Sequence, residues 1–315
     1  MKIVILDAAT WGADIDVTPL TSLGEATVYP STTPIEARER LIDAEVVVVN
    51  KIRMSAETLS FAKQLRLICV SATGYDNIDL TYCRLHGIAI CNVPAYCTDS
   101  VAQVTLSMAL ALATHLFAYR GFVHSGAYTR SGVANRLVPV FHELAGKTWG
   151  VVGGGSIGTR VAELATALGC RVLLCRRQRE ERYEQAELEP LLAASDIVSL
   201  HVPLSPSTRG MLDSRRIGMM KDGAILINVA RGAVTDEAAV AAAVLSGKLG
   251  GLGVDVYDGE PFRAEHPFSR IVHLENVCLT PHMAWGAAEA RARCIDTIAR
   301  NIRAFYEGNG QNRII

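Results

Sequence analysis

Short apolar runs rich in β-branched residues alternate with helix-like segments along almost the whole chain, and this alternation restricts the fold more than any other feature. Near-continuous apolar strands that alternate with helices form parallel sheets, because the crossover helices cover both faces of the sheet. The predicted strands fall into two groups, so we expect an α/β protein with two doubly wound, Rossmann-like or flavodoxin-like parallel sheets. The first group covers 2–7, 45–50, 66–71 and 88–93, and the second covers 148–153, 171–176, 196–201, 224–229, 251–257 and 276–282.

The predicted domain boundary lies near the stretch PAYCTDSVAQ. Asp99 or Ser100 can cap the N-terminus of a long apolar helix that we expect over 101–119. This helix carries the chain from the first sheet to the second, and an amphipathic helix over 285–307 returns it. We therefore predict a discontinuous domain, residues 1–99 with 288–315, and a second domain inserted into it, residues 100–287. Shorter helices are expected at 34–43, 157–168 and 237–247.

Composition narrows the class of protein and its surroundings. Half of the 315 residues are apolar, a fifth are charged, and the net charge is −1, so we expect no general attraction to nucleic acid or to an anionic membrane. The eight cysteines include no Cys-x-x-Cys pair and lie mostly inside apolar runs, which predicts buried free thiols rather than a metal site. The apolar stretch 101–118 contains polar residues and is expected to be a buried helix. A cytoplasmic protein without metal is the expectation.

The sequence VVGGGSIG follows the first predicted strand of the second group and precedes a helix-like segment. It fits the pattern G-x-G-x-x-G, and in this context the pattern indicates a dinucleotide-binding turn. The first glycine permits the tight turn, the second lets the backbone approach a pyrophosphate, and the third allows the helix to pack on the strand. The N–H groups of the helix N-terminus then face the phosphates. The predicted coenzyme contacts at this turn are Gly153, Gly155, Ser156, Ile157 and Gly158.

A cluster of arginines follows the next strand. Where an acidic residue commonly binds the adenosine ribose, about twenty positions beyond the glycines, this chain has Arg176, followed by Arg177. An arginine pair attracts a 2′-phosphate and can bind it in a fork. We therefore predict a preference for NADP(H), with NAD(H) possible because Glu180 and Glu181 can neutralise part of the charge. Arg179 is left unassigned.

Three later stretches place charged or titratable residues after predicted strands, at the edge where open α/β sheets bind ligands. They are NVARGAVTDE, GVDVYDGEP and LTPHMAWGA. With 191–212, they resemble the D-isomer-specific 2-hydroxyacid dehydrogenases over nearly the whole chain. By that resemblance, Arg231, Glu260 and His282 match the family's catalytic trio.

The reversible reduction of a 2-oxo acid, which this family catalyses, explains these three residue types. A guanidinium suits the carboxylate and the adjacent carbonyl of a 2-oxo acid. Imidazolium can give a proton to the carbonyl oxygen near neutral pH, and a neighbouring carboxylate favours that protonated form. In the reverse direction, neutral His282 acts as the base.

The resemblance implies further coenzyme contacts. Asp255 matches a residue that hydrogen-bonds the nicotinamide carboxamide, with a structural role in a turn as the alternative. Pro203, Thr208 and Ala230 match positions that line the coenzyme cleft.

The resemblance makes residues 100–287 the dinucleotide-binding domain and residues 1–99 with 288–315 the substrate domain, and it also implies substrate contacts. In the loop 70–80, the amides of Thr73 and Gly74 are expected to face the substrate carboxylate, unless the loop is a simple strand-to-helix turn. Asn50 and Lys51 are expected at the same cleft, with a solvated lysine as the alternative. Trp285 either walls the substrate pocket or belongs to an interdomain core. The remaining histidines are expected to be structural or on the surface: His86, His115, His124, His142, His201, His266 and His273.

The sequences ATGYDNIDL, VAQ (101–103) and PHMAW are most similar to the hydroxypyruvate/glyoxylate reductase (glycerate dehydrogenase) branch of the family. The expected activity is therefore NADP(H)-preferring reduction of a small 2-oxo acid, hydroxypyruvate or glyoxylate. A D-lactate-type or other D-2-hydroxyacid dehydrogenase is the alternative, and a dinucleotide-sensing, corepressor-like binding protein is a remote one. The resemblance implies a homodimer, although the loop 124–144 has no secure counterpart in the family.

Overall fold

The computed structural model describes residues 1–178 and 181–315. The two residues between these ranges are Arg179 and Glu180, so what the sequence analysis says of these two side chains concerns residues outside the described ones. The chain divides into two compact units, Met1–Cys97 with Gly286–Ile315 (unit 1) and Thr98–Trp285 (unit 2). Each unit contains one parallel sheet. The predicted class, α/β with two doubly wound parallel sheets, is confirmed.

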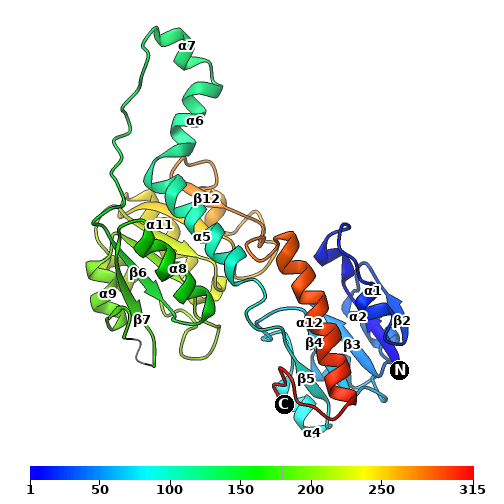
Figure 1. Ribbon diagram of the computed structural model, residues 1–315. Helices are drawn as coiled ribbons and strands as arrows, with labels where there is room; N and C mark the ends of the chain where they lie inside the picture. Colours follow the sequence, from blue (N-terminus) through cyan, green and yellow to red (C-terminus); the bar gives the residue numbers. More distant parts are fainter. Residues whose placement is uncertain (179–180) are drawn as a thin grey trace. The chain divides into compact units, whose positions relative to one another are not determined.

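Unit 1 is built on a five-stranded sheet in the order β2-β1-β3-β4-β5. Its central strands β3 and β4 are buried along their whole length, as their unbroken apolar sequences require. The edge strand β2, with the sequence EATV, is largely exposed and has no apolar run, which is why the sequence pattern did not indicate it. Helix α12 packs against β4 and α1 (Figure 1). The strands are β1 (Lys2–Ile5), β2 (Glu25–Val28), β3 (Val46–Val49), β4 (Leu67–Val70) and β5 (Ala89–Cys91), and the helices are η1 (Ala8–Trp11), α1 (Thr18–Thr21), α2 (Pro34–Arg40), α3 (Ala56–Leu59), α4 (Leu80–Leu85) and α12 (Ala288–Tyr306).

Unit 2 is built on a seven-stranded sheet in the order β12-β11-β10-β9-β6-β7-β8. The order reverses between β6 and β9, and open α/β sheets bind their ligands at such a switch point. The strands are β6 (Thr148–Val152), β7 (Arg171–Cys175), β8 (Glu184–Gln185), β9 (Ile197–Leu200), β10 (Ala224–Asn228), β11 (Leu249–Val254) and β12 (Val277–Leu279). The helices are α5 (Thr98–Ala113), α6 (Leu116–His124), α7 (Ala127–Ser131), α8 (Ser156–Ala167), α9 (Leu188–Ala194), α10 (Ser214–Met219), η2 (Gly232–Val234), α11 (Glu237–Leu245) and η3 (Pro267–Arg270).

Two apolar clusters cover the faces of the sheet in unit 2. Helices α5 and α8 cover one face, and α9, α10 and α11 belong to the other (Figure 1). Successive residues of β10 alternate between the clusters: Ile225 and Ile227 belong to the first and Leu226 to the second. A strand with apolar neighbours on both faces has a continuous apolar sequence, and β10 has one.

The long apolar helix differs from its prediction at both ends. Helix α5 begins at Thr98, so the expectation that Asp99 or Ser100 caps it is wrong. Both lie in the first turn, where Asp99 pairs with Arg160 at 3.0 Å and the Ser100 hydroxyl donates to the Ala284 carbonyl at 2.6 Å. The helix stops at Ala113, because His115 has a left-handed backbone with φ of 50°.

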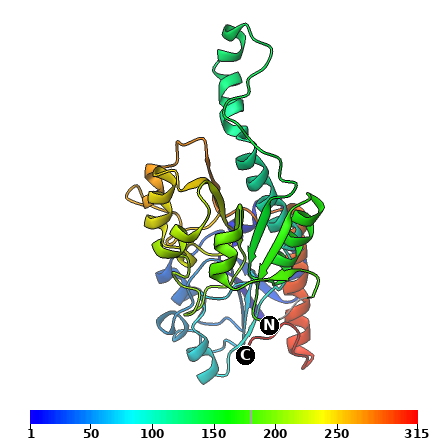
Figure 2. The same ribbon diagram turned by 90° about the vertical axis from the view of Figure 1, so that its left-hand side faces the viewer.

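Helices α6 and α7 extend away from the sheet of unit 2 (Figures 1 and 2). Every residue of the two helices is at least partly exposed to solvent. Among the described helices, no single one is long and apolar enough to cross a membrane; α5 and α6 together meet both measures but are bent by 66° at their break. All eight cysteines are free thiols and six are buried, which confirms that prediction.

Candidate active site

The three predicted catalytic residues follow three neighbouring strands of unit 2. Arg231 follows β10, Glu260 follows β11 and His282 follows β12. The Nδ1 atom of His282 lies 2.5 Å from Oε2 of Glu260, and about a quarter of each side chain is exposed to solvent. A carboxylate in this position orients an imidazole ring. The structure thus pairs a histidine with a carboxylate at the ligand-binding edge of the sheet.

The Arg231 turn is shaped by a buried asparagine, Asn228. Its side chain donates to the Arg231 carbonyl and accepts from the Ala230 N–H, both at 3.0 Å. The Arg231 guanidinium donates to the Ala230 carbonyl at 2.9 Å. Asn228 is 2% exposed, and the sequence analysis did not single it out. Its signal was its place at the end of a strand, directly before the motif that contains the arginine.

Asp255 lies at the base of the turn that contains His282. One of its oxygens accepts from the Thr280 hydroxyl at 2.6 Å and from the Met283 N–H at 2.8 Å, and the other accepts from the Ala284 N–H at 2.9 Å. Burial raises the pKa of this carboxyl, against the opposing effect of its hydrogen-bond donors. The observed bonds give Asp255 the structural role that was the alternative, and its contact with the nicotinamide carboxamide stays a prediction.

The backbone of His282 has φ of 53°, which is uncommon for a residue other than glycine. Such conformations cost free energy and occur where the surrounding structure holds them, often at functional sites. Here the neighbouring N–H groups of Met283 and Ala284 are held by Asp255. The turn thereby directs the imidazole toward Glu260.

The glycine-rich turn connects β6 to α8. Gly153 has φ of 105°, and a Cβ atom on Gly158 would lie 1.8 Å from the Gly153 carbonyl oxygen. A Cβ atom on Gly155 would meet no atom within 4 Å. The first and third glycines are thus required by the turn itself, whereas the second borders open space. Among the described residues, no side chain caps the N-terminus of α8, where Ser156 and Ile157 begin the helix. This geometry fits a bound pyrophosphate.

Arg176 lies beside the glycine-rich turn. A Cβ atom on Gly154 would lie 2.6 Å from Cδ of Arg176, so this side chain runs along the turn. Arg177 is exposed. The arginines that follow β7 therefore flank the predicted adenosine end of the coenzyme site.

The loop after β9 borders the same switch point. The Thr208 hydroxyl donates to the Pro203 carbonyl at 2.7 Å and accepts from the Ser205 N–H at 2.8 Å. A Cβ atom on Gly153 would lie 2.5 Å from the His201 carbonyl oxygen, so this loop begins against the glycine turn. Burial lowers the pKa of His201 to about 3, which agrees with its expected structural role.

In unit 1, buried Asp7 holds the turn that contains Asn50 and Lys51. Its carboxylate accepts from the Asn50 N–H at 3.0 Å and from the Lys51 N–H at 2.7 Å. Asn77 donates to the carbonyls of Asn50 at 3.1 Å and Ile52 at 3.0 Å. Sequence reasoning missed both supporting residues, because nothing along the chain links them to this turn.

The loop after β4 contains Thr73 and Gly74. The Thr73 hydroxyl donates to the Val93 carbonyl at 3.0 Å, and Asn92 donates to the Thr73 carbonyl at 2.7 Å. Within residues 1–178 and 181–315, the N–H groups of Thr73 and Gly74 donate no hydrogen bond. Such amides suit a carboxylate ligand. Trp285, the last residue of unit 2, is partly buried, which does not decide between its two predicted roles.

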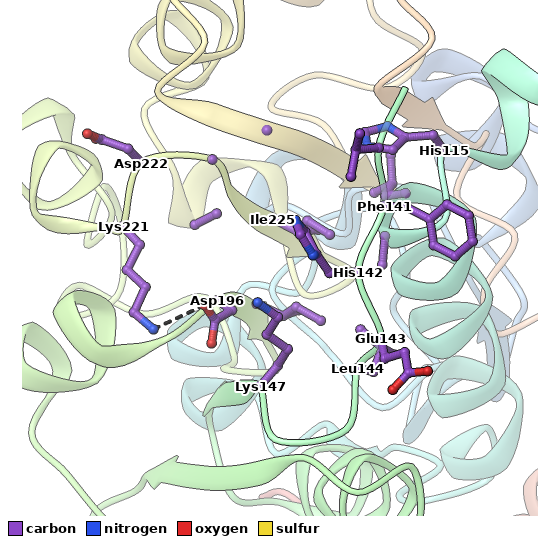
Figure 3. A pocket seen from close by; sticks show the side chains of 17 residues that line it. His115, Phe141, His142, Glu143, Leu144, Lys147, Asp196, Lys221, Asp222 and Ile225 are labelled. Atoms are coloured by element: carbon purple, nitrogen blue, oxygen red, sulfur yellow. Dashed lines mark hydrogen bonds and ion pairs between the residues drawn. The ribbon is translucent and has the colours of Figure 1, made fainter. Parts of the chain in front are cut away.

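One cavity lies away from all of these residues. It has a volume of about 430 Å³ and is formed at the amino ends of β6, β9 and β10. Figure 3 shows Lys221 directed at Asp196, and Nζ of Lys221 lies 3.1 Å from Oδ1 of Asp196. Because the ligand edge of an open α/β sheet is the opposite one, this cavity is separate from the predicted site. In the described part of the chain, no cluster of His, Cys, Asp and Glu could hold a metal ion.

Comparison with known proteins identifies the family. Residues 106–284 match the family model described as "D-isomer specific 2-hydroxyacid dehydrogenase, NAD binding domain". The chain is 33% identical to a hydroxypyruvate reductase of Blautia hydrogenotrophica, over 99% of both chains. It is 35% identical to a glycerate dehydrogenase of Methylorubrum extorquens, over 99% of this chain and 98% of the relative.

A solved structure agrees with this relationship. D-lactate dehydrogenase from Aquifex aeolicus, complexed with NAD and lactic acid, superposes with a TM-score of 0.88 at 30% identity, over 98% of this chain and 96% of that one. The chain therefore belongs to the D-isomer-specific 2-hydroxyacid dehydrogenases, NAD(P)-dependent oxidoreductases that act on the CH–OH group of 2-hydroxy acids.

Proposed function

We propose that the protein reduces hydroxypyruvate or glyoxylate and prefers NADP(H) as coenzyme. The observation that carries the reductase chemistry is the His282–Glu260 pair next to the Arg231 turn. The choice of substrate is supported by the hydroxypyruvate reductase and the glycerate dehydrogenase that match nearly the whole chain.

The coenzyme would be held at the glycine-rich turn, where the N–H groups of Gly155, Ser156 and Ile157 begin α8. Loop residues Pro203 and Thr208, together with Ala230, border the same site on the neighbouring strands. When bound, the nicotinamide supplies or accepts the hydride. The protein itself contributes binding, orientation and proton transfer.

Arg231 binds the substrate carboxylate and polarises the carbonyl that is reduced. His282 gives a proton to the carbonyl oxygen from Nε2, because its Nδ1 is paired with Glu260. The Glu260 carboxylate orients the ring for this transfer through its contact with Nδ1. In the direction of oxidation, neutral His282 removes the hydroxyl proton. Arg231, Glu260 and His282 are thus the proposed catalytic residues.

The amides of Thr73 and Gly74 are proposed to bind the substrate carboxylate, with Asn50, Lys51 and Trp285 as further substrate-binding residues. Support comes from the N–H groups of Thr73 and Gly74, which donate no hydrogen bond to any described residue and can therefore bind a ligand.

The preference for NADP(H) is supported by Arg176, which lies along the glycine turn, and by the exposed Arg177. Two guanidinium groups suit a 2′-phosphate, because they can form charge-assisted hydrogen bonds with it that a neutral 2′-hydroxyl cannot form. NAD(H) is the coenzyme of the A. aeolicus neighbour and is the alternative.

A panel of 2-oxo acids with each reduced coenzyme tests this function. We expect kcat/KM to be highest with hydroxypyruvate or glyoxylate and NADPH, measured as the loss of coenzyme absorbance. Pyruvate belongs in the panel, because the A. aeolicus D-lactate dehydrogenase shares the fold at 30% identity. A higher kcat/KM with pyruvate would replace the proposed substrate, and a preference for NADH would replace the proposed coenzyme.

We also propose a homodimer formed through α6, α7 and the loop that follows. This segment extends from unit 2 (Figures 1 and 2) and exposes a series of large apolar side chains, a feature typical of protein interfaces. They are Leu116, Val123, Tyr128, Val133, Leu137, Val138, Val140 and Phe141. Light scattering coupled to size exclusion is expected to give the mass of a dimer, and Leu137→Asp with Val140→Asp is expected to give a monomer.

A cytoplasmic location completes the proposal. It is supported by the eight free thiols, which suit a reducing compartment. Fractionation of cells that express the tagged protein tests it, and recovery outside the cytoplasmic fraction would contradict it.

A further inference from the structure

A buried, hydrogen-bonded pair of titratable side chains in unit 2 lies outside the proposed catalytic residues. Nε2 of His266 lies 2.7 Å from Oε2 of Glu237, and both side chains are 8% exposed. Glu237 is the first residue of α11, and His266 caps η3. The sequence analysis placed His266 among the structural or surface histidines and passed over Glu237. Nothing along the chain signals the pair, because its members are 29 residues apart.

The second oxygen of Glu237 holds the loop that contains Glu260. Oε1 of Glu237 accepts the N–H of Asp258 at 3.1 Å, two residues before the proposed catalytic glutamate. The preceding N–H, that of Tyr257, donates to Oε1 of Glu260 at 3.1 Å. Glu237 and Glu260 therefore bind the N–H groups of two adjacent loop residues, which connects His266 through the loop backbone to the carboxylate that faces His282.

Packing ties this loop to the other two catalytic turns. The Tyr257 hydroxyl donates to the Thr280 carbonyl at 2.8 Å, two residues before His282, and its ring packs on His266 at a centroid distance of 6.1 Å. On the other side, a Cβ atom on Gly232 would lie 2.0 Å from the Tyr257 carbonyl carbon. Since Gly232 follows Arg231, the backbone at Tyr257 and Asp258 contacts the turns of both Arg231 and His282.

The hydrogen-bond chemistry of the pair requires a carboxylate at 237. Nδ1 of His266 accepts the Phe268 N–H at 3.2 Å, so in the neutral ring Nε2 carries the proton and donates to Glu237. Both oxygens of Glu237 thus face N–H donors. Glutamine has the same shape, but in either orientation its NH₂ group would face one of these donors.

We propose that Glu237 and His266 form a positioning pair that holds the Tyr257–Glu260 loop so that the Glu260 carboxylate meets His282. The proposal rests on the proposed acid–base role of His282. The pair acts on the reaction only through the loop backbone and is not proposed to contact substrate or coenzyme.

Glu237→Gln tests the proposal. We expect kcat with the best 2-oxo acid to fall roughly 10- to 100-fold, because small displacements of a catalytic group have effects of this size, while KM and the coenzyme Kd change less than about threefold. The pH profile of kcat/KM is also expected to differ from that of the wild type, because the carboxylate that contacts the proposed proton donor is displaced. Glu189→Gln is the matched control, because Glu189 pairs with Arg215 at 2.5 Å on the surface of the same unit, and we expect wild-type kinetics.

His266→Asn is the second variant, because an asparagine oxygen can still accept the Phe268 N–H and keep the cap of η3. It is expected to lower kcat and to change the pH profile of kcat/KM in the same way as Glu237→Gln. If Glu237→Gln does not fold, as judged by thermal unfolding and coenzyme binding, His266→Asn decides alone. An unchanged pH profile in the folded variants would overturn the positioning role, even if kcat falls.

His282→Ala separates this proposal from the proposed function. Wild-type turnover in His282→Ala would overturn the acid–base role itself. If His282→Ala is inactive but Glu237→Gln behaves like the wild type, only the positioning role is wrong. When both hold, adding Glu237→Gln to His282→Ala should cause no further loss, because the two changes act through the same group.

Discussion

The two units of the chain share an architecture but present different chemistry at the carboxyl ends of their strands. Unit 1 presents backbone groups: the amides of Thr73 and Gly74, and a turn at Asn50 and Lys51 that buried Asp7 holds in place. Unit 2 presents side chains that can be charged and the N-terminus of α8. Backbone amides bind an anion but transfer no proton at neutral pH, whereas a paired imidazole does both. We therefore expect changes in unit 1 to affect substrate binding, and changes in unit 2, apart from the proposed carboxylate-binding Arg231, to affect turnover and coenzyme binding.

The largest effect is expected at His282. His282→Ala removes the proposed proton donor, and kcat should fall about 10²- to 10⁴-fold, with coenzyme Kd nearly unchanged. Steady-state kinetics and coenzyme fluorescence titration measure the two quantities. Turnover at the wild-type rate would remove His282 from the reaction and, with it, the contrast between the units.

Two glycines of the turn after β6 are expected to differ, because one supports both the fold and coenzyme binding and the other supports coenzyme binding alone. Gly158→Ala places a Cβ atom against the Gly153 carbonyl oxygen, at 1.8 Å before relaxation, so both Tm and coenzyme affinity should fall. Gly155→Ala points into open space and should leave Tm unchanged while weakening coenzyme binding by roughly tenfold, about 1.4 kcal/mol. If Gly155→Ala binds coenzyme normally, the pyrophosphate does not approach this glycine.

Coenzyme choice is expected to depend on the arginines after β7. The double variant Arg176→Ser, Arg177→Ser should raise the KM for NADPH roughly 10-fold or more, through loss of charge-assisted hydrogen bonds, and should leave the KM for NADH within about twofold. Arg171→Ser is the control, because Arg171 lies at the other end of β7 and pairs with Glu184 at 2.6 Å. Equal changes for both coenzymes would argue against a 2′-phosphate site.

The smallest effect is expected in unit 1. Asn77→Ala removes two hydrogen bonds to the turn at 50–52. Because each such bond contributes about 1 kcal/mol, the KM for the 2-oxo acid should rise several-fold while kcat stays the same. Asn276→Ala, which removes a bond to the Gly250 carbonyl in unit 2, is the control. A fall in kcat without a change in KM would contradict the expectation that unit 1 contributes to substrate binding rather than to turnover.

Most of the site could be predicted because its signals are local. The glycines, the residues after β10, β11 and β12, and the arginines after β7 each lie within a few positions of a strand that the apolar pattern predicts. Prediction was wrong where local pattern is weak. The exposed strand β2 has no apolar run. Helix α5 ends just before His115, whose left-handed backbone conformation cannot be read from the periodicity of the helix.

Within the candidate site, the hydrogen-bond partners of Asp255 could not be predicted from the sequence either. Its place after β11 was evident, and the family resemblance suggested a coenzyme contact. The structure shows three hydrogen bonds from residues 25 to 29 positions further along the chain, which hold the His282 turn. Direction and partner of a buried side chain depend on what the fold brings next to it.

The sequence by itself determined the alternation of strands and helices, the glycine turn, and the arginine, glutamate and histidine at the ends of successive strands. These features follow from backbone geometry and from spacing, which are properties of neighbouring residues. Only the tertiary structure decided that Glu237 meets His266, that Asn228 and Asp255 hold the turns of Arg231 and His282, and that Asp7 and Asn77 hold a loop of unit 1. A buried polar group must find a hydrogen-bond partner, and which residue provides it is settled by packing between distant segments.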